Sequence, residues 1–190
     1  MRAGAAYEMP SATFAEARRM HKALGIERGV IVQATTYGTD HRALLDALAA
    51  GGPNFRGCAV LRDEVTDSEL EALHKAGVRG VRFNLSKMVN FAPDPATIAR
   101  TIARVRPLGW YLKLQVHEGG LAECLPWFDS CELPIVVDHM GRADPALGRA
   151  CPTAQLALEL LKRGNWWLML SNGHKKSKQG FPWDDGAALG

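Results

Sequence analysis

The chain has 190 residues, of which 47% are hydrophobic and 23% charged, and its formal net charge is +3. These proportions are those of a folded domain and exclude disordered, collagen-like and coiled-coil proteins. The small excess of positive charge gives no reason to expect binding to nucleic acid or to a membrane surface. No apolar stretch approaches the ~20 residues that a membrane-spanning helix needs.

Predicted helices and strands alternate along the chain without a linker, so residues 1–190 are expected to form a single domain. Gly25 follows the first predicted helix, as expected of a residue that accepts a left-handed helix end, and Thr66 and Glu69 form a capping-box pattern. In chain order the predictions are helix 14–24, strand 28–34, helix 41–50, strand 55–61, helix 66–76, strand 78–84, helix 95–105, strand 110–116, helix 121–128, strand 134–139, helix 153–163 and strand 165–171. Three histidines on or beside these helices, His21, His41 and His74, are expected at the surface.

Most predicted strands are continuous apolar runs, which is typical of strands buried on both faces of a parallel sheet. Two α/β folds fit the repeated strand–helix unit: a doubly wound open sheet, or part of a (β/α)8 TIM barrel. No Gly-x-Gly-x-x-Gly motif follows the first strand, so the dinucleotide-binding form of the open sheet has no support.

Both folds place the functional site at the carboxyl ends of the strands, and polar residues fall there in this sequence. Gln115 and His117 lie two residues apart on one face of their strand and need polar partners or a pocket. The guanidinium of Arg82, near the end of an apolar strand, needs a carboxylate from the protein or from a ligand. Asp138 and His139 directly follow the apolar run 135–137, which favours a functional role for His139.

Together these residues predict a pocket for an anion. Positive charge comes from Arg82, Arg142 and either Lys175 or Lys176, and neutral donors are Thr35, Asn84 and Ser171. Guanidinium groups bind carboxylates with two parallel hydrogen bonds. A small carboxylated substrate fits this set, and a phosphate is an alternative, although no glycine-rich phosphate loop is present. The candidate site residues are Thr35, Thr36, Arg82, Asn84, Gln115, His117, His139, Arg142, Ser171 and Lys175.

Four segments, residues 29–35, 76–84, 135–142 and 167–171, carry a family resemblance by their order and spacing. The most specific are Gly-Val-Arg-Phe-Asn, ending at Asn84, and Asp-His-Met-Gly-Arg, ending at Arg142. The sequence resembles the amidohydrolase-related family (amidohydrolase 2 branch), and most of all its 2-pyrone-4,6-dicarboxylate lactonases, over about residues 11–185. The resemblance implies a (β/α)8 barrel that hydrolyses a lactone or a related ester or amide.

The resemblance also implies roles for individual residues. His139 matches a histidine that polarises the substrate carbonyl or binds metal, depending on the branch, so the cofactor is either absent or a divalent metal such as zinc. Arg82 and Arg142 match arginines that hold substrate carboxylates, and Thr35 or Thr36 matches a small hydrogen-bond donor.

Three positions depart from the family pattern. Gln115 stands where the lactonases often carry Tyr or His, Lys175 where an arginine is common, and Met88 near a position that is basic in the lactonases. These differences leave the exact substrate open.

Two family features are missing from the sequence. Residues 1–10 lack the His-x-His of the first barrel strand, and no counterpart of the aspartate on the last strand, which activates water, is found before Gly190. We therefore expect an incomplete barrel of about six strand–helix units, without the first and last strands. The strands bordering the gap would expose backbone groups that invite self-association.

The resulting functional hypothesis is a hydrolase for a small carboxylated lactone similar to 2-pyrone-4,6-dicarboxylate, acting by attack of water on the lactone carbonyl. With the expected base missing, the chain itself should have little or no activity. Two alternatives stay open: a lactone isomerase of the same branch, and a non-catalytic protein that binds a dicarboxylate or another chain. Four cysteines without a Cys-x-x-Cys pair, and no signal-peptide pattern, favour a cytoplasmic location.

Overall fold

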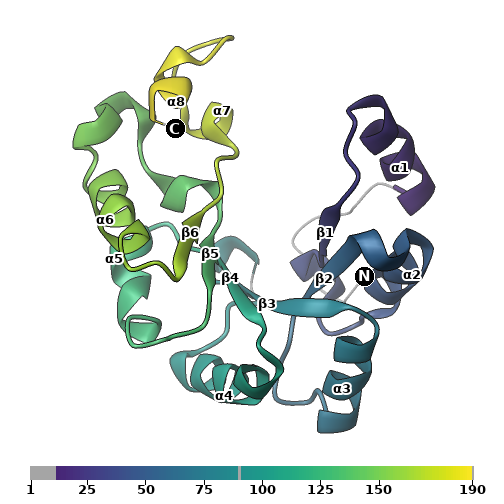
Figure 1. Cartoon of the computed structure of the whole chain (residues 1–190). Coiled ribbons are helices and arrows are strands. Elements are labelled where there is room, and N and C mark those ends of the chain that lie inside the picture. Colours follow the sequence, from purple (N-terminus) through teal and green to yellow (C-terminus); the bar gives the residue numbers. More distant parts are fainter. Residues whose placement is uncertain (1–11, 90, 190) are drawn as a thin grey trace.

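The computed structural model describes residues 12–89 and 91–189, and the segment in which the His-x-His motif is missing lies outside these residues. Six parallel strands form one sheet in the order β1 to β6, with a helix between each consecutive pair (Figure 1). The strands are β1 (Gly29–Val32), β2 (Phe55–Ala59), β3 (Val78–Asn84), β4 (Tyr111–Gln115), β5 (Ile135–Val137) and β6 (Trp166–Leu168). The helices are α1 (Phe14–Ala23), α2 (Arg42–Gly51), α3 (Asp67–Lys75), α4 (Pro95–Val105), α5 (Leu121–Cys124), α6 (Pro152–Leu161), α7 (Gly173–Lys176) and α8 (Asp184–Leu189).

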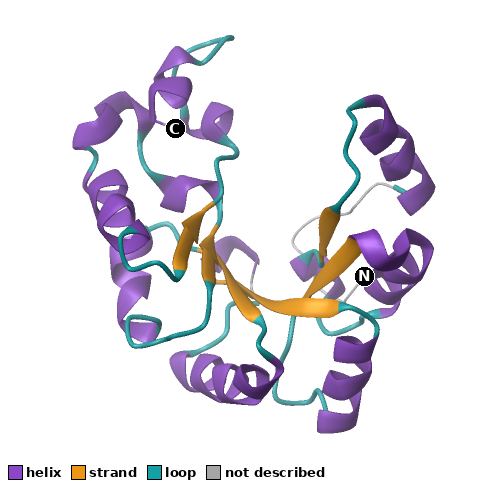
Figure 2. Cartoon of the chain, in the orientation of Figure 1, coloured by secondary structure: helices purple, strands orange, loops and turns teal. Residues whose placement is uncertain are grey.

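The strand order decides between the two predicted folds. A doubly wound sheet reverses its order at a switch point, whereas here each strand pairs with its neighbour in sequence. The sheet curls, and the helices lie on its outer side (Figure 2). This arrangement confirms the prediction of an incomplete (β/α)8 barrel with six strand–helix units.

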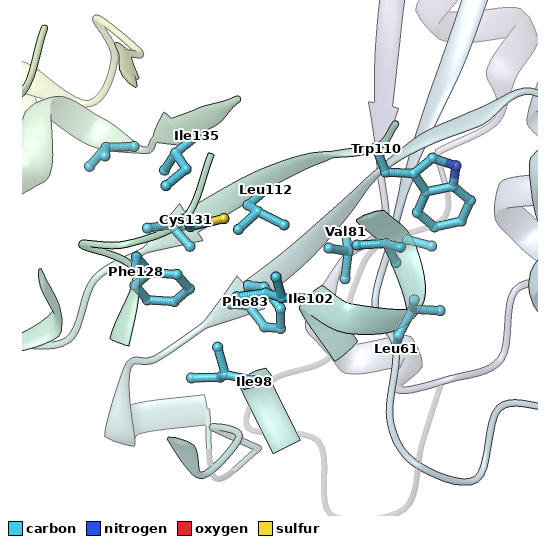
Figure 3. Packing of buried hydrophobic residues seen from close by; sticks show 14 of the residues in the cluster. Leu61, Val81, Phe83, Ile98, Ile102, Trp110, Leu112, Phe128, Cys131 and Ile135 are labelled. Carbon is cyan, nitrogen blue, oxygen red and sulfur yellow. The ribbon is translucent and has the colours of Figure 1, made fainter. Parts of the chain in front are cut away.

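The hydrophobic core lies between the sheet and the helices. On β4, Leu112 and Leu114 are fully buried in this layer, together with Phe83 of β3 and Ile98 of α4. Figure 3 shows Leu112, Phe83, Phe128 and Ile98 gathered in it. Because successive strand residues point to opposite faces, Lys113 and Gln115 lie on the other, concave face of the sheet.

The two strands that end the sheet, β1 and β6, each pair on one side only within the described residues. Apolar side chains are exposed there: Val30 is 51% exposed, Trp167 60% and Leu170 64%. This confirms the prediction that both end strands border a gap. Self-association through them stays a prediction.

Several local predictions were wrong in detail. The helix predicted over 121–128 ends at Cys124 and continues as a 3₁₀ turn, because Pro126 lacks the N–H that an α-helix requires. The histidines placed at the surface are half-buried. His74 accepts a hydrogen bond from Trp110 Nε1 at 2.9 Å, which satisfies the indole of a fully buried tryptophan, and His41 Nε2 lies 2.9 Å from the carbonyl of Val60.

Within the described residues, no helix has the length and apolar character needed to cross a membrane.

Candidate active site at the carboxyl ends of the strands

Side chains from β3 and β4 meet at the carboxyl end of the sheet, as predicted. Arg82 and Gln115 come from neighbouring strands in parallel register. The Arg82 guanidinium donates to Gln115 Oε1 at 2.5 Å and to the Gln33 carbonyl at 3.1 Å. Its Nε atom is buried and has no partner among the described residues. Among the described residues, the acceptors of Arg82 are the neutral Gln115 and Gln33 oxygens, and no carboxylate forms an ion pair with it.

Thr35 and Asn84, predicted as neutral donors, contact each other instead. The Asn84 amide donates to Thr35 Oγ1 at 3.1 Å, and Asn84 Oδ1 accepts from the Ser86 backbone N–H. Both are buried at the mouth of the sheet. Thr36 is buried as well, and its hydroxyl has no partner within the described part of the chain. The Thr36 hydroxyl therefore has no described partner, whereas the Thr35 hydroxyl oxygen accepts a hydrogen bond from Asn84.

His139 lies in an unusual turn directly after β5. Residues His139, Met140 and Arg142 have φ values of 56°, 53° and 63°, in the left-handed region that side chains rarely adopt. Such backbone conformations cost about 1–3 kcal/mol each and cluster at functional sites. His139 Nδ1 lies 2.8 Å from Ser171 Oγ, and the Asn172 amide lies 3.1 Å from the same nitrogen. The predicted residues His139 and Ser171 are therefore brought together.

Burial is the largest cause that lowers the pKa of the His139 imidazole below its ordinary value. The positive charges of Arg82, Lys113 and Lys175 lower this pKa further, against the opposing effect of the preceding carboxylate. The ring is therefore neutral at physiological pH and can both donate and accept a hydrogen bond.

Among the described residues, Arg142, His117 and Lys175 make no hydrogen bond to this cluster, although the charge of Lys175 acts on His139. Arg142 is half-buried, and its Nε atom has no partner among the described residues. His117 lies 3.3 Å from Glu123 Oε2 on α5 and accepts a hydrogen bond from the Gly119 N–H, so its contacts are with the segment that follows it in the chain. Lys175 is exposed on α7. Substrate contacts for these three residues stay predictions.

Sequence reasoning missed a buried ion pair beneath the site. Lys113 Nζ lies 2.5 Å from Asp138 Oδ1, and the two side chains are 5% and 3% exposed. A period-two signal was available, because Lys113 stands between Tyr111 and Gln115 on the same face of β4. In the sequence, Lys113 alternates with the apolar residues Leu112 and Leu114, which face the helices. This alternation is also the pattern of a strand with one solvent-exposed face, so the lysine resembles an ordinary surface residue.

Metal ligands are not gathered in this region. No three His, Cys, Asp or Glu side chains come together in residues 12–89 and 91–189. Catalytic zinc usually has about three protein ligands, so the described residues do not supply a zinc site.

Comparisons with known proteins identify the family of this chain. A family model described as amidohydrolase matches residues 1–188. The 2-pyrone-4,6-dicarboxylate hydrolase of Comamonas testosteroni is 37% identical over 83% of this chain and 52% of its own length. The 4-sulfomuconolactone hydrolase of Hydrogenophaga intermedia is 26% identical over 94% of this chain and 59% of its own length.

Solved structures show the same fold. A structure from Pseudomonas putida named as a 2-pyrone-4,6-dicarboxylic acid hydrolase matches with a TM-score of 0.83 and 30% identity, over 98% of this chain and 67% of that one. A structure of the same name from Acinetobacter baumannii, with citric acid bound, also has a TM-score of 0.83, at 27% identity, over 99% of this chain and 70% of that one. The chain spans 52% to 60% of the curated relatives that it matches. From its fold and its sequence, the chain belongs to the amidohydrolase family.

Proposed function

We propose that this chain carries the substrate-binding part of a lactone hydrolase, and that its substrate is a small lactone with carboxylate groups, such as 2-pyrone-4,6-dicarboxylate. The observation that carries the proposal is the Arg82 guanidinium, which has no carboxylate partner among the described residues and lies close enough to His139 for its charge to lower the imidazole pKa. A guanidinium in this state is suited to bind a carboxylate. The names of the relatives support the same substrate class.

In the proposed mechanism Arg82 and Arg142 hold the carboxylates and set the orientation of the ring. The neutral His139 imidazole donates a hydrogen bond to the lactone carbonyl oxygen, where negative charge develops as water attacks. Ser171, 2.8 Å from His139 Nδ1, orients the imidazole ring. Positioned donors of this kind lower the barrier because they need no reorganisation when charge appears.

The attacking water also needs a base. Of the described carboxylates near the site, Asp138 is paired with Lys113, and Glu118 accepts hydrogen bonds from Ser86 and Lys87. Neither is positioned as a base, so we propose that residues 1–190 bind the lactone and turn it over slowly or not at all.

Purified chain should therefore bind 2-pyrone-4,6-dicarboxylate in isothermal titration calorimetry, and ultraviolet absorbance of the pyrone ring should report any turnover. His139→Gln should remove turnover and leave binding within about threefold, because the arginines supply most of the affinity for the carboxylates. The matched control is His21→Gln, which changes a histidine of α1 that stacks on Phe55 of β2. Absence of binding at millimolar lactone would overturn the proposal.

A second candidate is a lactone isomerase, because the D-galactarolactone isomerase of Agrobacterium fabrum is 25% identical over 90% of this chain. Analysis of products by NMR separates the two reactions. A shifted lactone without uptake of solvent oxygen would indicate the isomerase, and an opened acid would indicate the hydrolase.

A further inference from the structure

We propose that the buried ion pair between Lys113 and Asp138 is a positioning device that holds the left-handed turn 139–142, and with it His139, in the orientation that the lactone site requires. The catalytic role of the ion pair in this inference rests on the proposed function. Its structural content, that the pair fixes the turn, can be tested without any turnover.

The pair is placed to act on the turn. Asp138 immediately precedes His139 in the chain, and its carboxylate forms an ion pair by distance, without hydrogen-bond geometry, with Lys113 on the neighbouring strand β4. Its backbone is held at both ends, because the Asp138 N–H donates to the Leu114 carbonyl at 2.8 Å and the Gly141 N–H donates to the Asp138 carbonyl at 3.1 Å. Lys113 therefore fixes the residue from which the turn begins.

Lys113 also reaches the other side of the turn. Its Nζ atom lies 3.7 Å from Met169 Sδ, just after β6. The Met169 carbonyl accepts a hydrogen bond from the Met140 N–H inside the turn, and the Met169 N–H donates to Val137 at the end of β5. One ammonium group thus connects β4, the start of the turn and the chain segment against which the turn is hydrogen-bonded.

The turn needs such an anchor. Four consecutive residues, His139 to Arg142, have positive φ, and only one of them is glycine. Residues in this region persist only where the surrounding structure imposes the conformation. The hydrogen bond from the turn to Met169 crosses to β6, which ends the sheet and has a neighbour on one side only within the described residues.

The alternative is that the pair only fills space on the concave face. Buried ion pairs can often be replaced by apolar residues of similar volume without loss of stability. Melting temperature therefore cannot distinguish the two roles, and the test needs a signal from the turn itself.

Methyl-labelled methionine supplies this signal, since Met140 lies in the turn and Met169 beside Lys113. The first variant is Asp138→Asn, which keeps the shape but removes the charge. The second is the double variant K113M/D138L, which removes both charges and leaves neither one unpaired. Asp129→Asn is the matched control, because it breaks an exposed ion pair, Arg163–Asp129 at 2.6 Å, that includes no residue of the turn. Two-dimensional NMR of the methionine methyl groups and of the histidine rings compares all four proteins.

The proposal expects folded variants in which the Met140 methyl and the His139 ring resonances move or broaden, while Asp129→Asn leaves both unchanged. It is overturned if Met169 alone shifts and the Met140 and His139 resonances keep their wild-type positions. It is also overturned if both variants fail to fold while Asp129→Asn folds, because the pair would then be a requirement of the sheet.

Kinetics add a second measurement where the wild-type chain turns over the lactone. Displacement of a catalytic group by about 1 Å can cost about 100-fold in rate, so we expect kcat to fall roughly 10- to 100-fold with KM changed less than about threefold. If the wild-type chain neither binds nor hydrolyses the lactone, the proposed function fails, and the NMR comparison still decides whether the pair fixes the turn.

Discussion

Replacing Arg82 by methionine tests whether the site recognises carboxylates. The change removes the charge and both donors that contact Gln115 and the Gln33 carbonyl. A hydrogen bond to a charged group contributes about 1.5–3 kcal/mol, and an arginine can make two of them to one carboxylate. Arg82 is only half-buried, so solvent screening keeps the total near the value for one bond. We therefore expect a loss of about 2–3 kcal/mol, which weakens lactone binding roughly 30- to 150-fold.

The assay is isothermal titration calorimetry with 2-pyrone-4,6-dicarboxylate near neutral pH, at low and at high salt. The loss should shrink at high salt, because screening weakens charge interactions at partly exposed sites. Arg82→Lys keeps the charge but loses the two-donor geometry, and should fall between wild type and Arg82→Met. Arg100→Met, which breaks an exposed ion pair with Asp63, is the control. Binding by Arg82→Met within twofold of wild type, with the melting temperature unchanged, would refute the reasoning.

Three further predictions concern stability. Phe83→Ala empties a fully buried position and should lower the free energy of unfolding by about 3–5 kcal/mol in urea titrations, whereas Phe181→Ala, at an 83% exposed position, should change it by less than about 0.5 kcal/mol. Thr66→Ala removes the side-chain oxygen that accepts the capping hydrogen bond from the Glu69 N–H and should cost about 1 kcal/mol of folding free energy, and an unchanged urea midpoint would contradict this. The pKa of His139 is lowered in the folded state, so the unfolded chain takes up the proton first as pH falls below the ordinary value of 6.5. Stability should therefore decrease from pH 7 toward pH 5, and His139→Gln should flatten that decrease in paired urea titrations.

Local sequence signals were sufficient for much of the architecture. Strand β3 and helix α4 have the bounds that the sequence predicts, 78–84 and 95–105. Asp94 caps the helix and Pro95 begins it, and both act within one turn of the chain. Short-range signals such as these can be read without knowing which distant residues pack nearby. The same signals predicted that polar groups collect at the carboxyl ends of the strands.

The choice between an open sheet and a barrel depended on the tertiary structure. Hydrogen bonds between strands decide the strand order, and a repeated strand–helix pattern is compatible with either arrangement. The family resemblance pointed to the barrel, and the sequential order of β1 to β6 established it.

The contacts of the site were also decided by tertiary structure. Lys113 and Asp138 are 25 positions apart, and His139 and Ser171 are 32 apart. Their pairing depends on strand register, which no local pattern records. The sequence by itself determined which chemical groups reach the carboxyl edge of the sheet. Only the packed structure determined that Thr35 is engaged by Asn84, that Arg82 lacks a carboxylate partner among the described residues, and that a buried lysine supports the histidine turn, because each depends on side chains brought together across the sheet.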